Sequence, residues 1–124
     1  MKNIYKVLEN LSNSKFRSSF HLRKYMIDYI NDKGLQAIEE HAYDFINKRI
    51  KPKDIKNDGH QTPMKGHPVF IAQHACGCCC RNCLEKWHNI DKNRELTKDE
   101  VNYLVRLIME WINMELKEST NKSK

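Results

Sequence analysis

The clearest helical pattern in this sequence lies near its C-terminus. Thr97 and Glu100 stand three residues apart, as in the capping box that begins many helices, because each side chain can bond the other residue's backbone N–H. The apolar residues that follow recur at helical spacing and form one stripe: Val101, Leu104, Val105, Ile108 and Ile112. A chain of 124 residues has room for one hydrophobic core. We therefore expect a single small domain that buries this stripe.

Two amphipathic stretches occur earlier in the chain. Residues 4–11 place apolar side chains at i, i+3, i+4 and i+7, which predicts a short helix. Residues 22–32 form a second helical stretch, for which Gly34 is the expected C-terminal cap. The side chains expected to face inward are Ile4, Val7, Leu8 and Leu11 in the first stretch and Met26, Ile27 and Ile30 in the second.

A third helix should end before Pro52, because proline cannot donate to the helical ladder and restricts the residue before it. Its expected inward face is Leu35, Ile38, Ala42, Phe45 and Ile46. A polar loop over residues 51–66 is long for so small a domain, and long ordered loops are often functional. Short helices are then expected over residues 68–75, with proline in the first turn, and 82–88.

The sequence shows no repeat and no strand pattern, so we expect a mainly α protein. Residues 1–118 form its single domain, and residues 119–124 are a flexible polar tail. No apolar run approaches the roughly 20 residues that span a bilayer. The first residues also lack the basic-then-apolar layout of a secretion signal. We therefore expect a cytoplasmic protein without a membrane partner.

All five cysteines fall between Cys76 and Cys83, and His74 and His88 flank them. A reducing compartment argues against disulfides. Burial as small apolar side chains accounts for one or two of the cysteines, but hardly for all five. Zinc takes about four thiolate or imidazole ligands, so a metal site over residues 74–88 is the better account of this cluster. Zinc is favoured over an iron–sulfur cluster, because mixed cysteine and histidine ligation suits zinc.

The spacing leaves the choice of ligands open. Two residues separate Cys80 from Cys83, as in a metal-binding turn, and His88 extends this to the first three ligands of a retroviral zinc knuckle. The knuckle's last cysteine would fall at Asn93. If residues 83–88 are helical, however, Cys83 and His88 point roughly 140° apart. The better sets would then be Cys79 with Cys83, or His74 with Cys80 and Cys83.

Three motifs carry a resemblance to a known family: Gln61-Thr62-Pro63-Met64-Lys65-Gly66-His67-Pro68-Val69-Phe70, then Ala72-Gln73-His74-Ala75, then Cys79-Cys80-Arg81-x-Cys83-Leu84-x-Lys86-Trp87-His88. Together they resemble the uncharacterised bacterial family called domain of unknown function 4186, over residues 16–111. The resemblance implies no established activity. It does imply a set of metal ligands, namely Cys79, Cys80, Cys83 and His88. His74 is then a reserve ligand, and Cys76 and Cys78 are extra cysteines outside the ligand set.

His67 and His74 are seven residues apart, so they would share a face of one helix. One hypothesis is a metal- or thiol-dependent hydrolase in which either histidine is the base that activates a bound water or a thiolate. The simpler interpretation is that His67 caps a helix and His74 hydrogen-bonds in the core. The sequence shows no metalloprotease helix, phosphate-binding glycine loop or nucleophile elbow.

The formal net charge is +6, and its basic side chains cluster in two places. Residues 15–24 interleave basic residues with aromatic ones, and residues 48–56 hold five basic residues and one carboxylate. The basic residues are Lys15, Arg17, Arg23 and Lys24, and Lys48, Arg49, Lys51, Lys53 and Lys56. Such surfaces can bind a nucleic-acid backbone, or they can simply be solvated. Our leading hypothesis is a zinc-stabilised binding module, with nucleic acid as the first partner to test.

Overall fold

The computed structural model describes residues 3–53 and 58–122 of the chain. These ranges hold six α-helices, a 3-10 turn and a π-helical turn, and no strand. The elements in chain order are α1 (Ile4–Ser12), η1 (Arg17–Ser19), α2 (Lys24–Lys33), α3 (Leu35–Phe45), η2 (Ile46–Ile50), α4 (Pro68–Ala75), α5 (Arg81–His88) and α6 (Lys98–Lys122). The expected mainly α class is confirmed.

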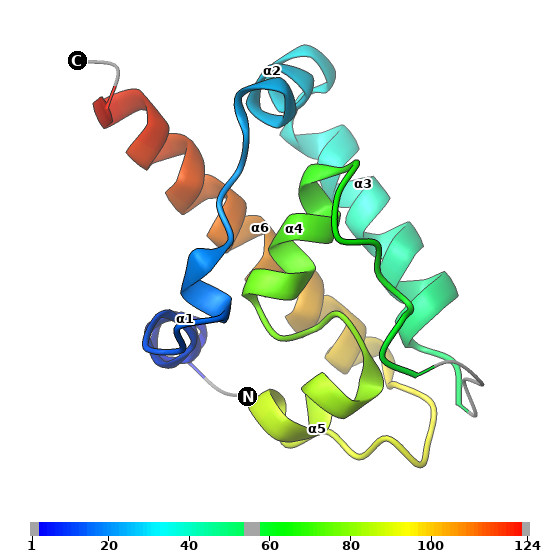
Figure 1. The fold of residues 1–124 in the computed structure, drawn as a ribbon. Helices are drawn as coiled ribbons and strands as arrows, with labels where there is room; N and C mark the ends of the chain where they lie inside the picture. The colour runs from blue at the N-terminus through cyan, green and yellow to red at the C-terminus, as the bar shows by residue number, and fades with distance from the viewer. Residues whose placement is uncertain (1–2, 54–57, 123–124) are drawn as a thin grey trace.

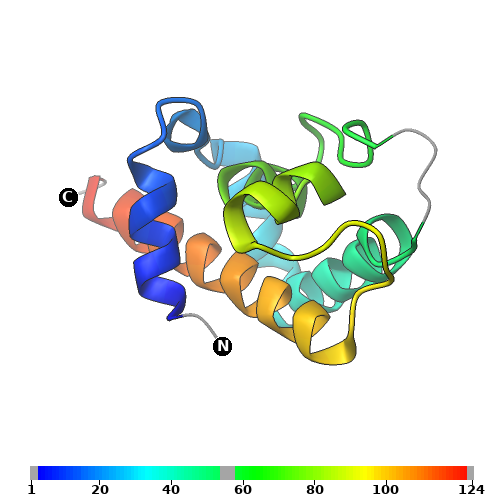
Figure 2. The same ribbon diagram turned by 90° about the horizontal axis from the view of Figure 1, so that it is seen from below.

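The long helix α6 is the element against which much of the molecule packs (Figure 1). It begins with the expected capping box: Glu100 N–H donates to Thr97 Oγ1 at 3.1 Å, and Thr97 N–H donates to Glu100 Oε1 at 2.8 Å. All residues of the expected stripe are buried. Figure 2 shows α1 crossing the C-terminal half of α6 while α3 lies along its N-terminal half. No described helix is long and apolar enough to cross a membrane.

Helix α6 continues to Lys122, so the expected tail boundary at residue 119 falls inside the helix. Thr120 Oγ1 donates to the carbonyl of Leu116 at 3.0 Å within this last stretch. The preceding residues, 114–118, are Met, Glu, Leu, Lys and Glu, all good helix formers, and Leu116 packs against the core.

Helices α2 and α3 differ from expectation at their ends. Helix α2 begins at Lys24 rather than at residue 22, and Ile27 is only partly buried. Gly34 joins the two helices with φ 88° and ψ 151°, a conformation that favours glycine. Leu35, which was expected to face inward, is 42% exposed, because it is the first residue of α3 and lies beyond the core.

Helix α3 continues into the wider π-helical turn η2, and the helical segment ends before Pro52, as the proline predicts. Lys51 N–H donates to the carbonyl of Ile46 at 2.8 Å, which closes the wider turn. Ile46 and Ile50 are both fully buried as a result. Helix α4 then lies at the centre of the molecule, in contact with η1, α2, α3 and α6 (Figure 1). Pro68 is in its first turn, as expected.

Candidate metal centre

The turn between α4 and α5 brings the cysteines of the second half of the cluster together. Gly77 has φ 67°, and a Cβ there would lie 2.9 Å from Trp87 Cγ, so the ring packs directly on the turn's backbone. Cys80 is the N-cap of α5, and its sulfur accepts the N–H of Cys83 at 3.4 Å. The N-cap position therefore aims Cys80 at the first turn of the helix that carries Cys83.

Three sulfurs form a compact group: those of Cys79, Cys80 and Cys83 all lie within 4.8 Å of one another. Cys83 Sγ is the shared neighbour, 3.2 Å from Cys80 Sγ and 3.5 Å from Cys79 Sγ. Cys79 and Cys80 are buried, while Cys83 is partly exposed. These three residues could hold a metal ion. They are three of the four primary ligands that the family resemblance implies.

Arg17 completes this cluster, and the sequence interpretation had placed it among surface basic residues. Its side chain is buried, with 8% exposure. Its Nη2 donates to Cys83 Sγ at 3.1 Å, and its Nη1 donates to Cys79 Sγ at 3.5 Å and to the carbonyl of His74 at 2.7 Å. The signal that could have identified it is Phe16-Arg17, where the family resemblance begins.

The contacts among these groups move the pKa values of the three thiols apart. Hydrogen bonds from Cys79 and then Cys80, with further help from Arg17, lower the pKa of Cys83. Hydrogen bonds with Cys79 and Cys83, together with burial, raise the pKa of Cys80. The bond with Cys80 lowers the pKa of Cys79, but the bond with Cys83 and burial raise it overall. Negative charge in this group is therefore centred on Cys83, next to a buried guanidinium.

The loop over residues 58–66 is bonded to the cysteine turn. Thr62 Oγ1 donates to the carbonyl of Cys79 at 2.8 Å. Gln73 Nε2, from α4, donates both to Thr62 Oγ1 and to the carbonyl of Cys78 at 3.2 Å. The conspicuous Gln-Thr-Pro stretch of the sequence thus supports the backbone from which Cys79 projects. Residues 54–57 of the longer predicted loop lie outside the described residues.

Asp58 holds the other side of the turn by capping α5. Its Oδ1 accepts the N–H of Arg81 at 3.0 Å, and its Oδ2 accepts the N–H of Asn82 at 3.2 Å. The Arg81 guanidinium is buried and donates to five backbone carbonyls, at 3.3 Å or less: those of Ile50, Lys51, Pro52, Asp91 and Arg94. Sequence reasoning missed both roles, because only the fold brings these segments together.

His88 was expected to complete the ligand set, but the structure does not bring it to the sulfurs. Its Nδ1 lies 3.0 Å from the hydroxyl of Tyr103, and its Nε2 lies 2.8 Å from the carbonyl of Cys76. Residues 81–88 form one helix, so five positions separate Cys83 and His88 by more than a third of a turn. His88 is buried and joins α5 to the cysteine turn and to α6.

His74, the reserve ligand, sits beside the cluster and faces the loop. Its Nε2 lies 3.2 Å from the carbonyl of Thr62 and 3.0 Å from that of Pro63, so this nitrogen carries the hydrogen. Its ring stacks on Phe20 with centroids 5.4 Å apart. Burial lowers the pKa of His74, which favours the neutral ring. A neutral ring protonated at Nε2 keeps its lone pair on Nδ1.

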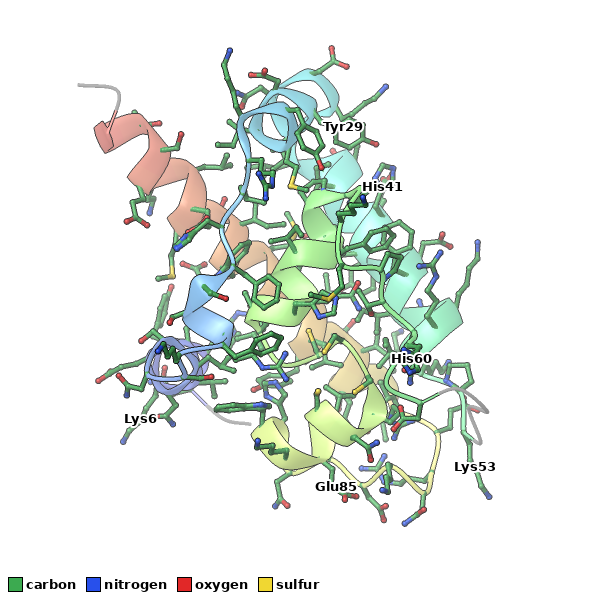
Figure 3. The ribbon with its side chains drawn as sticks, viewed as in Figure 1. Lys6, Tyr29, His41, Lys53, His60 and Glu85 are labelled. Atoms are coloured by element: carbon green, nitrogen blue, oxygen red, sulfur yellow. The ribbon has the colours of Figure 1, made fainter. Side chains whose placement is uncertain are left out.

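His67 is the N-cap of α4 rather than a base near the thiols. Its Nδ1 accepts the N–H of Val69 at 3.0 Å, and its Nε2 lies 3.1 Å from Nδ1 of His41. Figure 3 shows His41 and Tyr29 near the end where α2 and α3 meet. Aromatic rings surround the pair: Tyr29, Phe45 and Phe70. These contacts fit the capping interpretation of His67 and the hydrogen-bonding interpretation of His74 better than the hydrolase hypothesis.

Cys76 and Cys78 lie in the hydrophobic core, as expected for extras. Both are 0% exposed. Cys76 Sγ is 3.9 Å from the carbonyl of Leu107 on α6, and burial raises the pKa of both thiols. Two of the five cysteines thus behave as small core residues.

The basic clusters are weaker surfaces than their sequence predicts. Arg17 is withdrawn into the cysteine site. Lys48 pairs with Asp44 at 3.1 Å, and Lys51 pairs with Glu95 at 3.6 Å. Two further cations in the described part are Arg49 and Lys53. The guanidinium of Arg49 lies over the rings of Phe45 and Phe70. Lys56 lies outside the described residues.

Comparison with known proteins identifies the family but no structural relative. No solved structure matches this chain. The model of the family described as Domain of unknown function (DUF4186) matches residues 5–113. This match spans η1, the loop, the cysteine turn and most of α6, and therefore every residue of the three-sulfur cluster and Arg17. The chain belongs to this family of unknown function, as its motifs predicted.

Proposed function

We propose that Cys79, Cys80 and Cys83 hold a zinc ion whose role is structural. The observation that carries the proposal is the compact three-sulfur group beside the buried guanidinium of Arg17. Around this group meet three segments that are distant in the sequence, namely η1, the loop over residues 58–66 and the turn between α4 and α5. A metal there would fix the turn between α4 and α5, to which the other two segments are joined by hydrogen bonds.

The donor set suits a soft or borderline divalent ion. Zinc–thiolate bonds of about 2.3 Å in a tetrahedron require sulfurs about 3.8 Å apart. The closest pairs are at 3.2 and 3.5 Å, so the sulfurs would open by only a few tenths of an ångström. An iron–sulfur cluster usually needs four thiolates, and the two remaining cysteines are occupied in the hydrophobic core. Zinc is therefore the better match.

Charge balance supports three thiolates with a neutral fourth ligand. Three thiolates and a divalent ion leave one negative charge, which the guanidinium of Arg17 offsets within hydrogen-bond reach. His74 is our proposed fourth ligand, through Nδ1 after a shift of its ring toward the sulfurs. Its Nε2 already donates to backbone carbonyls, the pattern that orients most metal-bound histidines.

Elemental analysis and an absorption spectrum of the purified protein test the proposal directly. We expect about one zinc per chain and no visible absorption. Chelation and Cys83→Ser should each lower the melting temperature sharply, because binding energy of a structural metal is folding energy. Cys78→Ala is the matched control: it creates a core cavity but should retain the metal. Melting curves unchanged by both chelation and Cys83→Ser would refute a structural role.

The fourth ligand is tested separately with cobalt. Cobalt-loaded His74→Ala should keep the charge-transfer bands of three thiolates but bind the metal about tenfold or more weakly. An unaltered affinity and ligand-field spectrum would assign the fourth position to water instead.

Nucleic acid is a second and independent candidate partner. It is favoured by Arg49, which presents a cation over the rings of Phe45 and Phe70, close in sequence to Lys53. Such cations and rings suit single-stranded nucleic acid. Binding to DNA or RNA that weakens with salt, and weakens again in Arg49→Gln with Lys53→Gln, would support this candidate. No binding at low salt would refute it.

A further inference from the structure

We propose that Cys80 and Cys83 are also a redox pair, which a hydroperoxide converts to a disulfide. In the zinc-loaded protein this oxidation would release the ion, a consequence that rests on the proposed zinc site. The disulfide itself does not rest on it, because it needs only the two sulfurs, which lie 3.2 Å apart.

The geometry of the two cysteines suits a disulfide. Their sulfurs are 3.2 Å apart, so closing the bond to about 2.05 Å requires them to approach by roughly 1.2 Å. Cys80 is the N-cap of α5 and Cys83 lies in the helix's first turn, so the pair has Cys-x-x-Cys spacing, with the second cysteine as the exposed one. The other near sulfur, that of Cys79, is farther away at 3.5 Å.

The sulfur that an oxidant can reach from solvent should react first. Cys83 is partly exposed, whereas the four other cysteines of the chain are buried. Arg17 Nη2 lies 3.1 Å from Cys83 Sγ, so the same guanidinium can donate to an oxygen that leaves from a bound peroxide. An oxidant therefore meets Cys83 beside a buried cation that can stabilise the departing charge.

The proposed reaction has two balanced steps. Cys83 sulfur attacks one peroxide oxygen, the O–O bond breaks, and the leaving alkoxide or hydroxide takes a proton, which leaves a sulfenic acid on Cys83. Cys80 sulfur then attacks Cys83 sulfur, the S–S bond forms and the S–O bond breaks, and the hydroxyl leaves as water with the proton of Cys80. Overall, two thiols and a hydroperoxide give a disulfide, an alcohol or water, and water.

The test treats the full-length chain with hydrogen peroxide in two forms, zinc-loaded and metal-free. We expect both forms to lose about 2 Da in mass and to give a peptide map that links Cys80 to Cys83. The zinc-loaded form should also release its ion to a chelating dye. Cys80→Ser should retain its fold, because serine is a favoured N-cap, and should stop at a sulfenic acid on Cys83 that dimedone labels. Cys79→Ser should still form the disulfide.

The outcomes separate the two proposals. If the protein binds no zinc but the link from Cys80 to Cys83 forms, the metal proposal fails and the redox pair stands. A link that instead includes Cys79, a link between two chains, or no link in the metal-free form overturns the redox pair. Arg17→Gln should slow the reaction about tenfold or more, while Arg106→Gln, on the exposed face of α6, should not change it.

Discussion

Replacing Arg17 by methionine should lower the stability of the protein more than any ordinary surface substitution. Methionine has a similar apolar stem but no donor. It would leave the carbonyl of His74 without its 2.7 Å bond and the sulfurs of Cys79 and Cys83 without their cation. Arg17 is 8% exposed, so water cannot readily replace these bonds.

The magnitude follows from the bonds that are lost. Burial alone would lower the pKa of Arg17, but the hydrogen bonds and charges of Cys79 and Cys83 raise it, so the charged form is favoured in the folded protein. A hydrogen bond to a charged group contributes about 1.5–3 kcal/mol, and bonds to sulfur lie at the weak end. We expect a loss of about 3 kcal/mol, which corresponds to a drop of roughly 10–15 °C in melting temperature for a domain of this size.

Thermal unfolding followed by circular dichroism, with reductant present, measures this loss. Arg106→Met is the matched control, because Arg106 lies on the exposed face of α6, and its effect should stay within about 0.5 kcal/mol. Arg17→Lys should be intermediate, since one ammonium does not reproduce a planar fork. If Arg17→Met melts within about 2 °C of the unaltered protein, the guanidinium does not hold the cluster and our reasoning is wrong.

Two further predictions concern the elements around the cluster. Burial, and then the charge of His41, lower the pKa of His67 from 6.5 to about 4, so the unfolded chain takes up this proton first. Stability should therefore fall as the pH decreases from 6.5 to about 4; urea midpoints would show this dependence, and His67→Asn, which retains a capping oxygen, should weaken it. Gly77→Ala should cost about 2 kcal/mol, because φ is 67° and the new Cβ would lie 2.9 Å from the ring of Trp87. Urea denaturation measures this cost, and an unchanged midpoint would show that the ring moves freely.

Much of the fold could be predicted because its signals are local. The capping box of Thr97 and Glu100, the stop before Pro52 and the start at Pro68 depend on neighbouring residues alone. Burial at a helix end depends instead on where the other helices lie. Leu35 fits the apolar pattern of α3 and still is 42% exposed, because it is the first residue of that helix and lies beyond the core.

The place of the candidate site in the sequence could be predicted from the closely spaced cysteines. The three clustered sulfurs are those that the family resemblance implied, but two other parts needed the fold. Arg17 contacts residues 57 to 66 positions away, and nothing in a basic stretch marks one arginine as buried. The spacing of His88 matched that of a zinc-knuckle ligand. Because residues 81–88 are helical, however, His88 and Cys83 point in different directions, and this helical offset was the physical argument against His88 as a ligand.

Two buried arginines restrain the cysteines that could hold a metal ion. Arg17 holds the sulfurs from the N-terminal segment, while Arg81 fixes the start of α5 to carbonyls on both neighbouring loops. Protein hydrogen bonds thus restrain both ends of the cysteine group, and the binding of an ion would require little further ordering. A preorganised site binds more tightly, and an ion that binds only the folded chain stabilises it in proportion to the logarithm of its concentration over Kd. Loosening either arginine should therefore weaken metal affinity and thermal stability together.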